Sequence, residues 1–178
     1  MKTKVNSKAT KLVKTALIGA MYAAFTYISA AFGLAYGAVQ FRFSEILTIL
    51  PIFCPEAAIG LTVGCIVSNI ISSVSPLDTI FGSAATLLAA VLTRALRKIT
   101  IKGYPILSFL SPVIINAVIV GAELCMFGTG EGVTLTLFSA NALSVALGEA
   151  AVVFTLGTAL FYAIGRNERL KCLLEAGI

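Results

Sequence analysis

The stretch QFRFSEILTILP, from Gln40 to Pro51, places an arginine and a carboxylate, Arg42 and Glu45, at the start of a short apolar segment. Most other charges in the chain stand outside its apolar segments. A charge at the edge of hydrocarbon is costly and usually marks a partner, a ligand or a pathway. The stretch therefore predicts a membrane-embedded segment with a polar site at its mouth.

The composition of the whole chain agrees with a membrane protein. The 178 residues are 58% hydrophobic and 12% charged, and the mean hydropathy is +1.00. Soluble domains carry roughly 25% charged residues. Several apolar runs reach the roughly 20 residues that a helix needs to cross a bilayer, and no alternating strands of about ten residues are visible. The prediction is an all-α membrane protein with a single transmembrane domain over residues 1–178.

Six hydrophobic segments are expected to be transmembrane helices, and the second of them is short. At about 1.5 Å per residue it cannot cross upright as an α-helix, so it is predicted to be a partial span completed by irregular chain buried in protein. The first is expected to be a retained helix, because its apolar run is too long for a cleaved signal peptide. The segments cover residues 11–32, 41–53, 55–73, 79–96, 104–127 and 137–164.

Basic residues predict the orientation of these segments. Twelve of the 13 Lys and Arg residues fall into three clusters, before the first segment, after the fourth and after the sixth, and Arg42 stands alone. Basic clusters flank membrane helices on the cytoplasmic side. Six spans satisfy all three clusters and place both termini in the cytoplasm, with a basic arm at 1–10 and a tail at 166–178.

Three acids share the predicted outer half of the membrane with one strong base, Arg42. Glu45, Glu123 and Glu149 belong to the second, fifth and sixth segments. Glu149 lies deepest, about 18 Å into its helix by the helical rise. At least two of the three acids therefore lack a salt-bridge partner in the chain. A ligand that is cationic or rich in hydrogen-bond donors would supply one.

Amide and aromatic residues extend this predicted binding site. Asn116 lies seven residues before Glu123 and Asn141 eight residues before Glu149, so each amide accompanies an acid on its helix. Hydrogen bonding between helices is the alternative role for both amides. Phe43 and Tyr36 are candidates to stack on a planar ligand, or to anchor the protein at the membrane interface.

Several charged residues also have local interpretations. Arg42 and Glu45 are three residues apart and could form a helix pair. Arg42 is expected to hold Glu45 in place, or else to touch the ligand. Asp78 is predicted to cap the N-terminus of the fourth segment. Glu56 fits the first turn of the third segment, where a negative charge suits the helix dipole.

Small residues on the first segment predict a helix-packing face. Ala16, Ala20 and Ala24 recur every four residues and leave a groove that lets another helix approach closely. The partner is a helix of this chain or of another subunit. Gly60 and Gly64 form a second, weaker case in the third segment.

Missing motifs exclude several functions. The chain has no histidine, no GxxxxGK[ST] phosphate loop, and no CxxC spacing among its four cysteines. We expect no metal, no cofactor, no nucleic-acid partner and no ATP hydrolysis by this chain. The absence of an internal repeat disfavours a self-sufficient rocking transporter.

The basic N-terminus, six short spans and AxxxA face resemble the substrate-binding S components of energy-coupling factor (ECF) vitamin transporters. QFRFSEILTILP, GAEL at Gly121 to Leu124 and NALSVALGEA at Asn141 to Ala150 are similar to the QueT family of that group, over about residues 12–165.

This resemblance implies a prokaryotic plasma-membrane protein that binds a 7-deazaguanine, preQ0 or preQ1, from outside. It also implies docking through Ala16, Ala20 and Ala24 to a transmembrane coupling subunit that works with two ATPase subunits. Two alternatives remain open. One is a stand-alone proton- or sodium-coupled carrier with Glu149 as the titrating group, and the other is a membrane scaffold protein without a small-molecule site.

Overall fold

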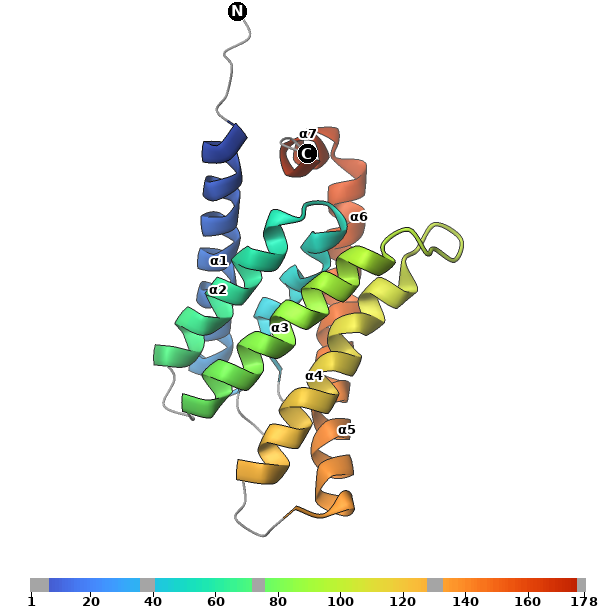
Figure 1. The fold of residues 1–178 in the computed structure, drawn as a ribbon. Coiled ribbons are helices and arrows are strands. Elements are labelled where there is room, and N and C mark those ends of the chain that lie inside the picture. The colour runs from blue at the N-terminus through green and yellow to red at the C-terminus, as the bar shows by residue number, and fades with distance from the viewer. Residues whose placement is uncertain (1–6, 36–40, 72–75, 128–132, 176–178) are drawn as a thin grey trace, which may run out of the picture.

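The computed structural model describes residues 7–35, 41–71, 76–127 and 133–175, and these residues are helical apart from connections and one isolated bridge between Ile101 and Tyr104 (Figure 1). The prediction of an all-helical chain is confirmed. The elements are α1 (Ser7–Ala31), η1 (Phe43–Ile52), α2 (Glu56–Ile71), α3 (Pro76–Leu96), α4 (Ile106–Phe127), α5 (Leu135–Val152), η2 (Val153–Gly157), α6 (Thr158–Arg166) and α7 (Glu168–Glu175).

Four helical stretches in the described residues are long and apolar enough to cross a membrane. They are α1, α3, α4 and the continuous run of α5, η2 and α6 over Leu135–Arg166. Segments two and three form the shorter η1 and α2. All six predicted segments are thus helical, and the count of six crossings stays a prediction.

The second segment is a 3₁₀-helix, which the sequence did not predict. A 3₁₀-helix rises about 2.0 Å per residue, so the ten residues of η1 span about 20 Å, where an α-helix would span about 15 Å. The helix η1 packs in the hydrophobic core through the buried side chains of Leu47, Ile49 and Leu50. Arg94 donates from Nη1 to the carbonyl oxygens of Pro51 and Ile52, at 3.2 and 3.1 Å, and so satisfies its C-terminal end.

The start of α1 and the helix α7 lie at the same end of the bundle (Figure 1). Lys14 joins them, because its Nζ donates to the carbonyl oxygen of Leu174 at 2.9 Å. Lys11 forms an ion pair with Glu56 at 3.7 Å at the start of α2. Glu56 occupies the first turn of α2, as predicted. The cytoplasmic orientation of this end remains a prediction.

Glycines, and not the alanine stripe, make the close contact between α1 and α2. A Cβ atom on Gly64 would lie 2.5 Å from the carbonyl oxygen of Gly19, and a Cβ on Gly19 would lie 2.9 Å from that of Gly60. The backbones therefore touch where side chains are absent. Ala16, Ala20 and Ala24 are exposed in the described chain.

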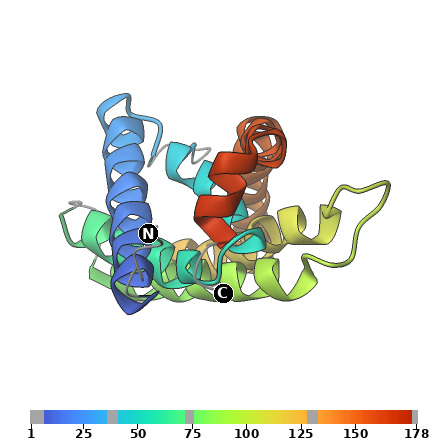
Figure 2. The ribbon, with the colours of Figure 1, turned by 90° about the horizontal axis from the view of Figure 1, so that it is seen from above.

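An apolar groove lies between α1 on one side and α6 and α7 on the other. The view from above shows α1 apart from these two helices (Figure 2). Leu47 and Leu50 of η1 line it together with Leu17 of α1 and Leu173 of α7. Including space open to the surroundings, the groove holds about 1370 Å³. Neither α7 nor the π-helical turn η2 within segment six was predicted from the sequence.

Candidate functional site

A cavity of about 340 Å³, including space open to solvent, lies between η1, α3, α4 and α5. Only about 20 Å³ of this space admits the centre of a water-sized sphere, far less than the 300 to 1,000 Å³ usual for small-molecule sites, so a ligand of that size enters only if the lining side chains move apart. Four of the predicted site residues line the cavity, and four others line it that were not predicted. The lining residues are Arg42, Glu45, Gly82, Thr86, Asn116, Val120, Val145 and Glu149.

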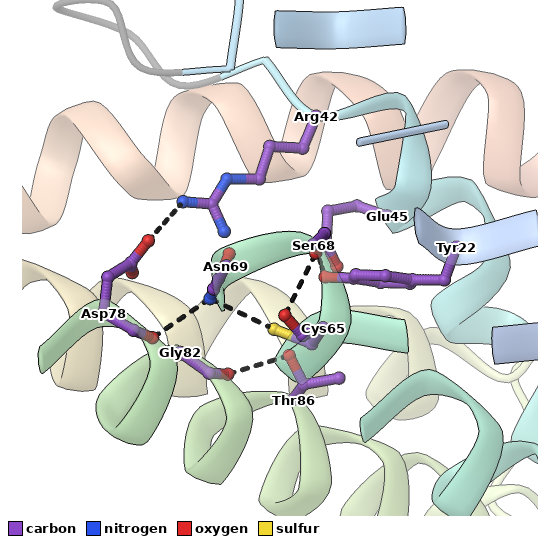
Figure 3. Close-up of polar contacts among 9 residues, drawn as sticks. All are labelled: Tyr22, Arg42, Glu45, Cys65, Ser68, Asn69, Asp78, Gly82 and Thr86. Carbon is purple, nitrogen blue, oxygen red and sulfur yellow. Dashed lines mark hydrogen bonds and ion pairs between the residues drawn. The ribbon is translucent and has the colours of Figure 1, made fainter. Parts of the chain in front are cut away.

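Glu45 is held by a tyrosine on α1. The Tyr22 hydroxyl donates to Oε1 of Glu45 at 2.6 Å, and the two side chains are 1% and 3% exposed (Figure 3). Hydrogen bonds to a charged acceptor are about twice as strong as neutral ones. The bond fixes one oxygen of the carboxyl group. The other, Oε2, is buried without a hydrogen-bond partner among the described residues.

Arg42 forms an ion pair with Asp78, at 3.7 Å between Nη2 and Oδ2 (Figure 3). Asp78 is also fixed through its backbone, since Asn69 Nδ2 donates to its carbonyl oxygen at 3.0 Å. Arg42 also interacts electrostatically with Glu45, so the predicted pairing of these two residues stays a prediction beside the ion pair with Asp78. The predicted N-cap at Asp78 is wrong, because α3 begins two residues earlier at Pro76, a residue favoured in the first helical turn.

A hydrogen bond from a backbone N–H to a serine side chain joins the start of η1 to α1. The Phe43 N–H donates to Ser29 Oγ at 2.7 Å. Within η1, the Thr48 hydroxyl donates to the carbonyl oxygen of Glu45 at 2.6 Å. Arg42 keeps an extended backbone just before the helix. These contacts set the positions from which Arg42 and Glu45 reach the cavity.

Glu149 brings a second carboxyl group to the cavity from α5. It is 6% exposed and interacts with Glu45 and with Asn116 of α4. Its Oε1 is buried without a hydrogen-bond partner in the described chain. A buried polar atom without a partner is costly. The cavity thus presents two carboxyl oxygens, one from Glu45 and one from Glu149, that are free to accept hydrogen bonds.

Glu123 and Asn141 do not line this cavity. Glu123 is 6% exposed, interacts electrostatically with Asp78 and Arg42, and has a buried Oε2 without a described partner. Asn141 Nδ2 also lacks one. Asn141 directly precedes Ala142, which makes the close contact of α5 with α4: a Cβ on Gly121 would lie 2.8 Å from the Cα of Ala142.

The two predicted aromatic residues have different outcomes. Phe43 is half-buried and does not line the cavity. Tyr36 lies outside the described residues. Stacking on a ligand therefore stays a prediction for both.

Tyr22 is the functional residue that the sequence reasoning missed. It lies on one face of α1 with Thr26 and Ser29, at spacings of four and three residues, and all three are at most 1% exposed. A polar stripe within an apolar helix was the signal that could have found it. Thr86 and Gly82, which line the cavity from α3, had no comparable signal.

Comparison with known proteins identifies the family of the chain. A family model described as QueT transporter matches residues 12–166. The chain belongs to the QueT transporter family. The queuosine precursor transporter QueT of Lactococcus lactis subsp. cremoris (strain MG1363) is 35% identical over 81 residues, which are 46% of this chain and 47% of that relative. The chain therefore matches about half the length of this curated relative, and no solved structure matches. The family resemblance inferred from the sequence is confirmed.

Proposed function

We propose that the chain is the substrate-binding subunit of an ATP-driven ECF importer and binds a 7-deazaguanine queuosine precursor from the outer side. The observation that carries the proposal is the buried cavity with two partner-free carboxyl oxygens, on Glu45 and Glu149, in a chain of the QueT transporter family. The name of the Lactococcus relative supports the class of solute.

The hydrogen-bonding groups of a 7-deazaguanine complement those of the cavity. Its guanine-like edge presents adjacent ring N–H and amino groups, and the two oxygens of one carboxylate can accept a hydrogen bond from each of them. Glu45 or Glu149 accepts the hydrogen bonds of this edge. Asn116 or Asn141 donates to the ring carbonyl, and Asn116 is the amide that lines the cavity. Glu123 accepts remaining donors near the outer end.

The docking face of the proposed subunit is the alanine stripe of α1. Ala16, Ala20 and Ala24 are exposed, while the α1 contact with α2 uses Gly19, Gly60 and Gly64. Small side chains in a membrane let a second helix approach closely. We assign this face, with the apolar groove beside it, to a transmembrane coupling subunit that two ATPase subunits drive.

In this proposal the chain spans the plasma membrane of a prokaryote six times, as a single domain with both termini in the cytoplasm. The shared end of α1 and α7 supports an even number of crossings. Membership of a transporter family supports a chain that is not itself an enzyme. ATP hydrolysis belongs to the partner subunits.

A stand-alone carrier coupled to a proton or sodium ion is the second candidate, because Glu149 is a buried acid with a partner-free oxygen. Uptake distinguishes the two functions. We expect cells that express this chain with the coupling and ATPase subunits to accumulate labelled 7-deazaguanine, and cells with the chain alone to accumulate none. Uptake by the chain alone that collapses with the ion gradient would establish the carrier instead.

A further inference from the structure

The groups around the cavity carry more negative than positive charge. Arg42, Glu45 and Glu149 line it, further titratable side chains of the neighbouring helices interact with these three, and Arg42 is ion-paired with Asp78. These groups are Tyr22 of α1, Arg42 just before η1, Glu45 of η1, Cys65 of α2, Asp78 of α3, Glu123 of α4 and Glu149 of α5.

The excess charge is concentrated in the Glu45 and Glu149 carboxyl groups. They interact with each other, are 3% and 6% exposed, and each keeps one buried oxygen without a described hydrogen-bond partner. Two neighbouring carboxyl groups that are shielded from water do not both ionise, because each charge opposes the other. In the empty cavity one proton is therefore needed to neutralise one of the two carboxyl groups.

We infer that Glu45 and Glu149 share one proton in the empty cavity and exchange it for the ammonium group of a cationic ligand. This inference rests on the proposed function and deepens it by assigning the charge of the ligand. Within the class of 7-deazaguanines, it selects an aminomethyl compound, which is cationic at neutral pH, over a neutral nitrile.

The exchange keeps the charge of the buried site constant. Before binding, the pair holds one proton and one negative charge. After binding, both carboxyl groups are ionised, the ammonium stands between them, and the proton has left to solvent, so the site still carries one negative charge. The ammonium donates to Oε2 of Glu45 and Oε1 of Glu149, which satisfies the two free acceptors. A neutral nitrile offers no donor there and leaves the proton in place.

Calorimetric titration of the purified wild-type protein tests the exchange. Titration in buffers of different ionisation enthalpy counts the protons released for each ligand bound. We expect about one proton for the aminomethyl 7-deazaguanine and none for the nitrile, with the cation bound at least about tenfold more tightly, a difference of about 1.4 kcal/mol. Its affinity should rise with pH, by up to about tenfold per unit, because binding releases a proton.

The variant Glu149→Gln should lose both the proton release and the preference for the cation. Glu56→Gln is the matched control, because Glu56 is also buried, at 8% exposure, but pairs with Lys11 at the opposite end of the bundle. It should keep both properties. Equal affinities of the wild-type protein for the two ligands, without proton release, would overturn the inference.

Infrared spectroscopy of the ligand-free protein tests the shared proton independently of any ligand. The difference spectrum between wild type and Glu149→Gln should contain the band of a protonated carboxyl group, and the difference between wild type and Glu56→Gln should lack it. The absence of this band from the first difference spectrum would refute the shared proton. Failure of both 7-deazaguanines to bind, with the band present, would refute the proposed function and leave the shared proton supported.

Discussion

Single residues decide where the two carboxyl groups point. Tyr22 uses its hydroxyl to fix Oε1 of Glu45, and this contact joins α1 to the cavity. Sequence reasoning found Glu45 and Glu149 from their cost in hydrocarbon. It could not find the partners, because Tyr22 meets Glu45 and Asp78 meets Arg42 only through the tertiary fold.

The variant Tyr22→Phe removes the hydroxyl and little else. A hydrogen bond to a charged group contributes about 1.5 to 3 kcal/mol, so we expect ligand affinity to fall by roughly tenfold or more as Glu45 loses its orientation. Calorimetry with an aminomethyl 7-deazaguanine measures this. Tyr27→Phe is the control, because the Tyr27 hydroxyl lies on an exposed part of α1. Equal losses in both variants would contradict a specific role for Tyr22.

The buried ion pair of Arg42 and Asp78 predicts a coupled effect on stability. Arg42→Gln leaves Asp78 without its counter-charge, and breaking such a pair costs about 3 kcal/mol or more in free energy of unfolding. In an Asp78→Asn background the same change should cost much less. Thermal unfolding in detergent gives both values, and additive effects would show that the two side chains do not interact.

At the scale of elements, the sequence predicted the six apolar segments and their approximate ends from hydropathy alone. It could not predict that η1 winds as a 3₁₀-helix, since the choice depends on how Ile49 and Leu50 pack in the core and on Arg94 at its C-terminal end. Glu45, Asn116 and Glu149, all predicted site residues, line one cavity, while their place in the outer half of the membrane stays a prediction. Asn141 and Phe43 do not line the cavity, because hydropathy and residue spacing do not determine which side chains reach it in the tertiary fold.

The glycine contact between α1 and α2 predicts a link between packing and binding. A methyl group at residue 64 would meet the carbonyl oxygen of Gly19 and would lie 2.8 Å from the Cβ of Tyr22. Gly64→Ala should therefore destabilise the fold by about 1 to 3 kcal/mol and weaken binding by moving Tyr22 away from Glu45. Thermal unfolding and calorimetry measure the two effects.

Gly165→Ala supplies the comparison for this variant, because no atom lies within 4 Å of a Cβ built at that glycine. It should leave both stability and affinity close to the wild-type values. A Gly64→Ala protein as stable as Gly165→Ala would mean that the two helices separate easily.

At the scale of the whole molecule, ligand binding and transport depend on different surfaces of the chain. Ala20→Leu adds bulk to the exposed stripe of α1 without touching the cavity, so binding by the purified chain should persist while uptake with the partner subunits falls at least about tenfold. Ala84→Leu, on an exposed position of α3, is the matched control and should leave uptake unchanged. Equal uptake by the two variants would remove the stripe as the docking face.

The most direct test of the central proposal is calorimetric titration of the purified chain, without partner subunits, with an aminomethyl 7-deazaguanine. The account predicts saturable binding of one ligand per chain, weakened at least about tenfold by Glu45→Gln and by Glu149→Gln and unchanged by Glu56→Gln. No saturable binding, or the same affinity in all four proteins, would contradict it.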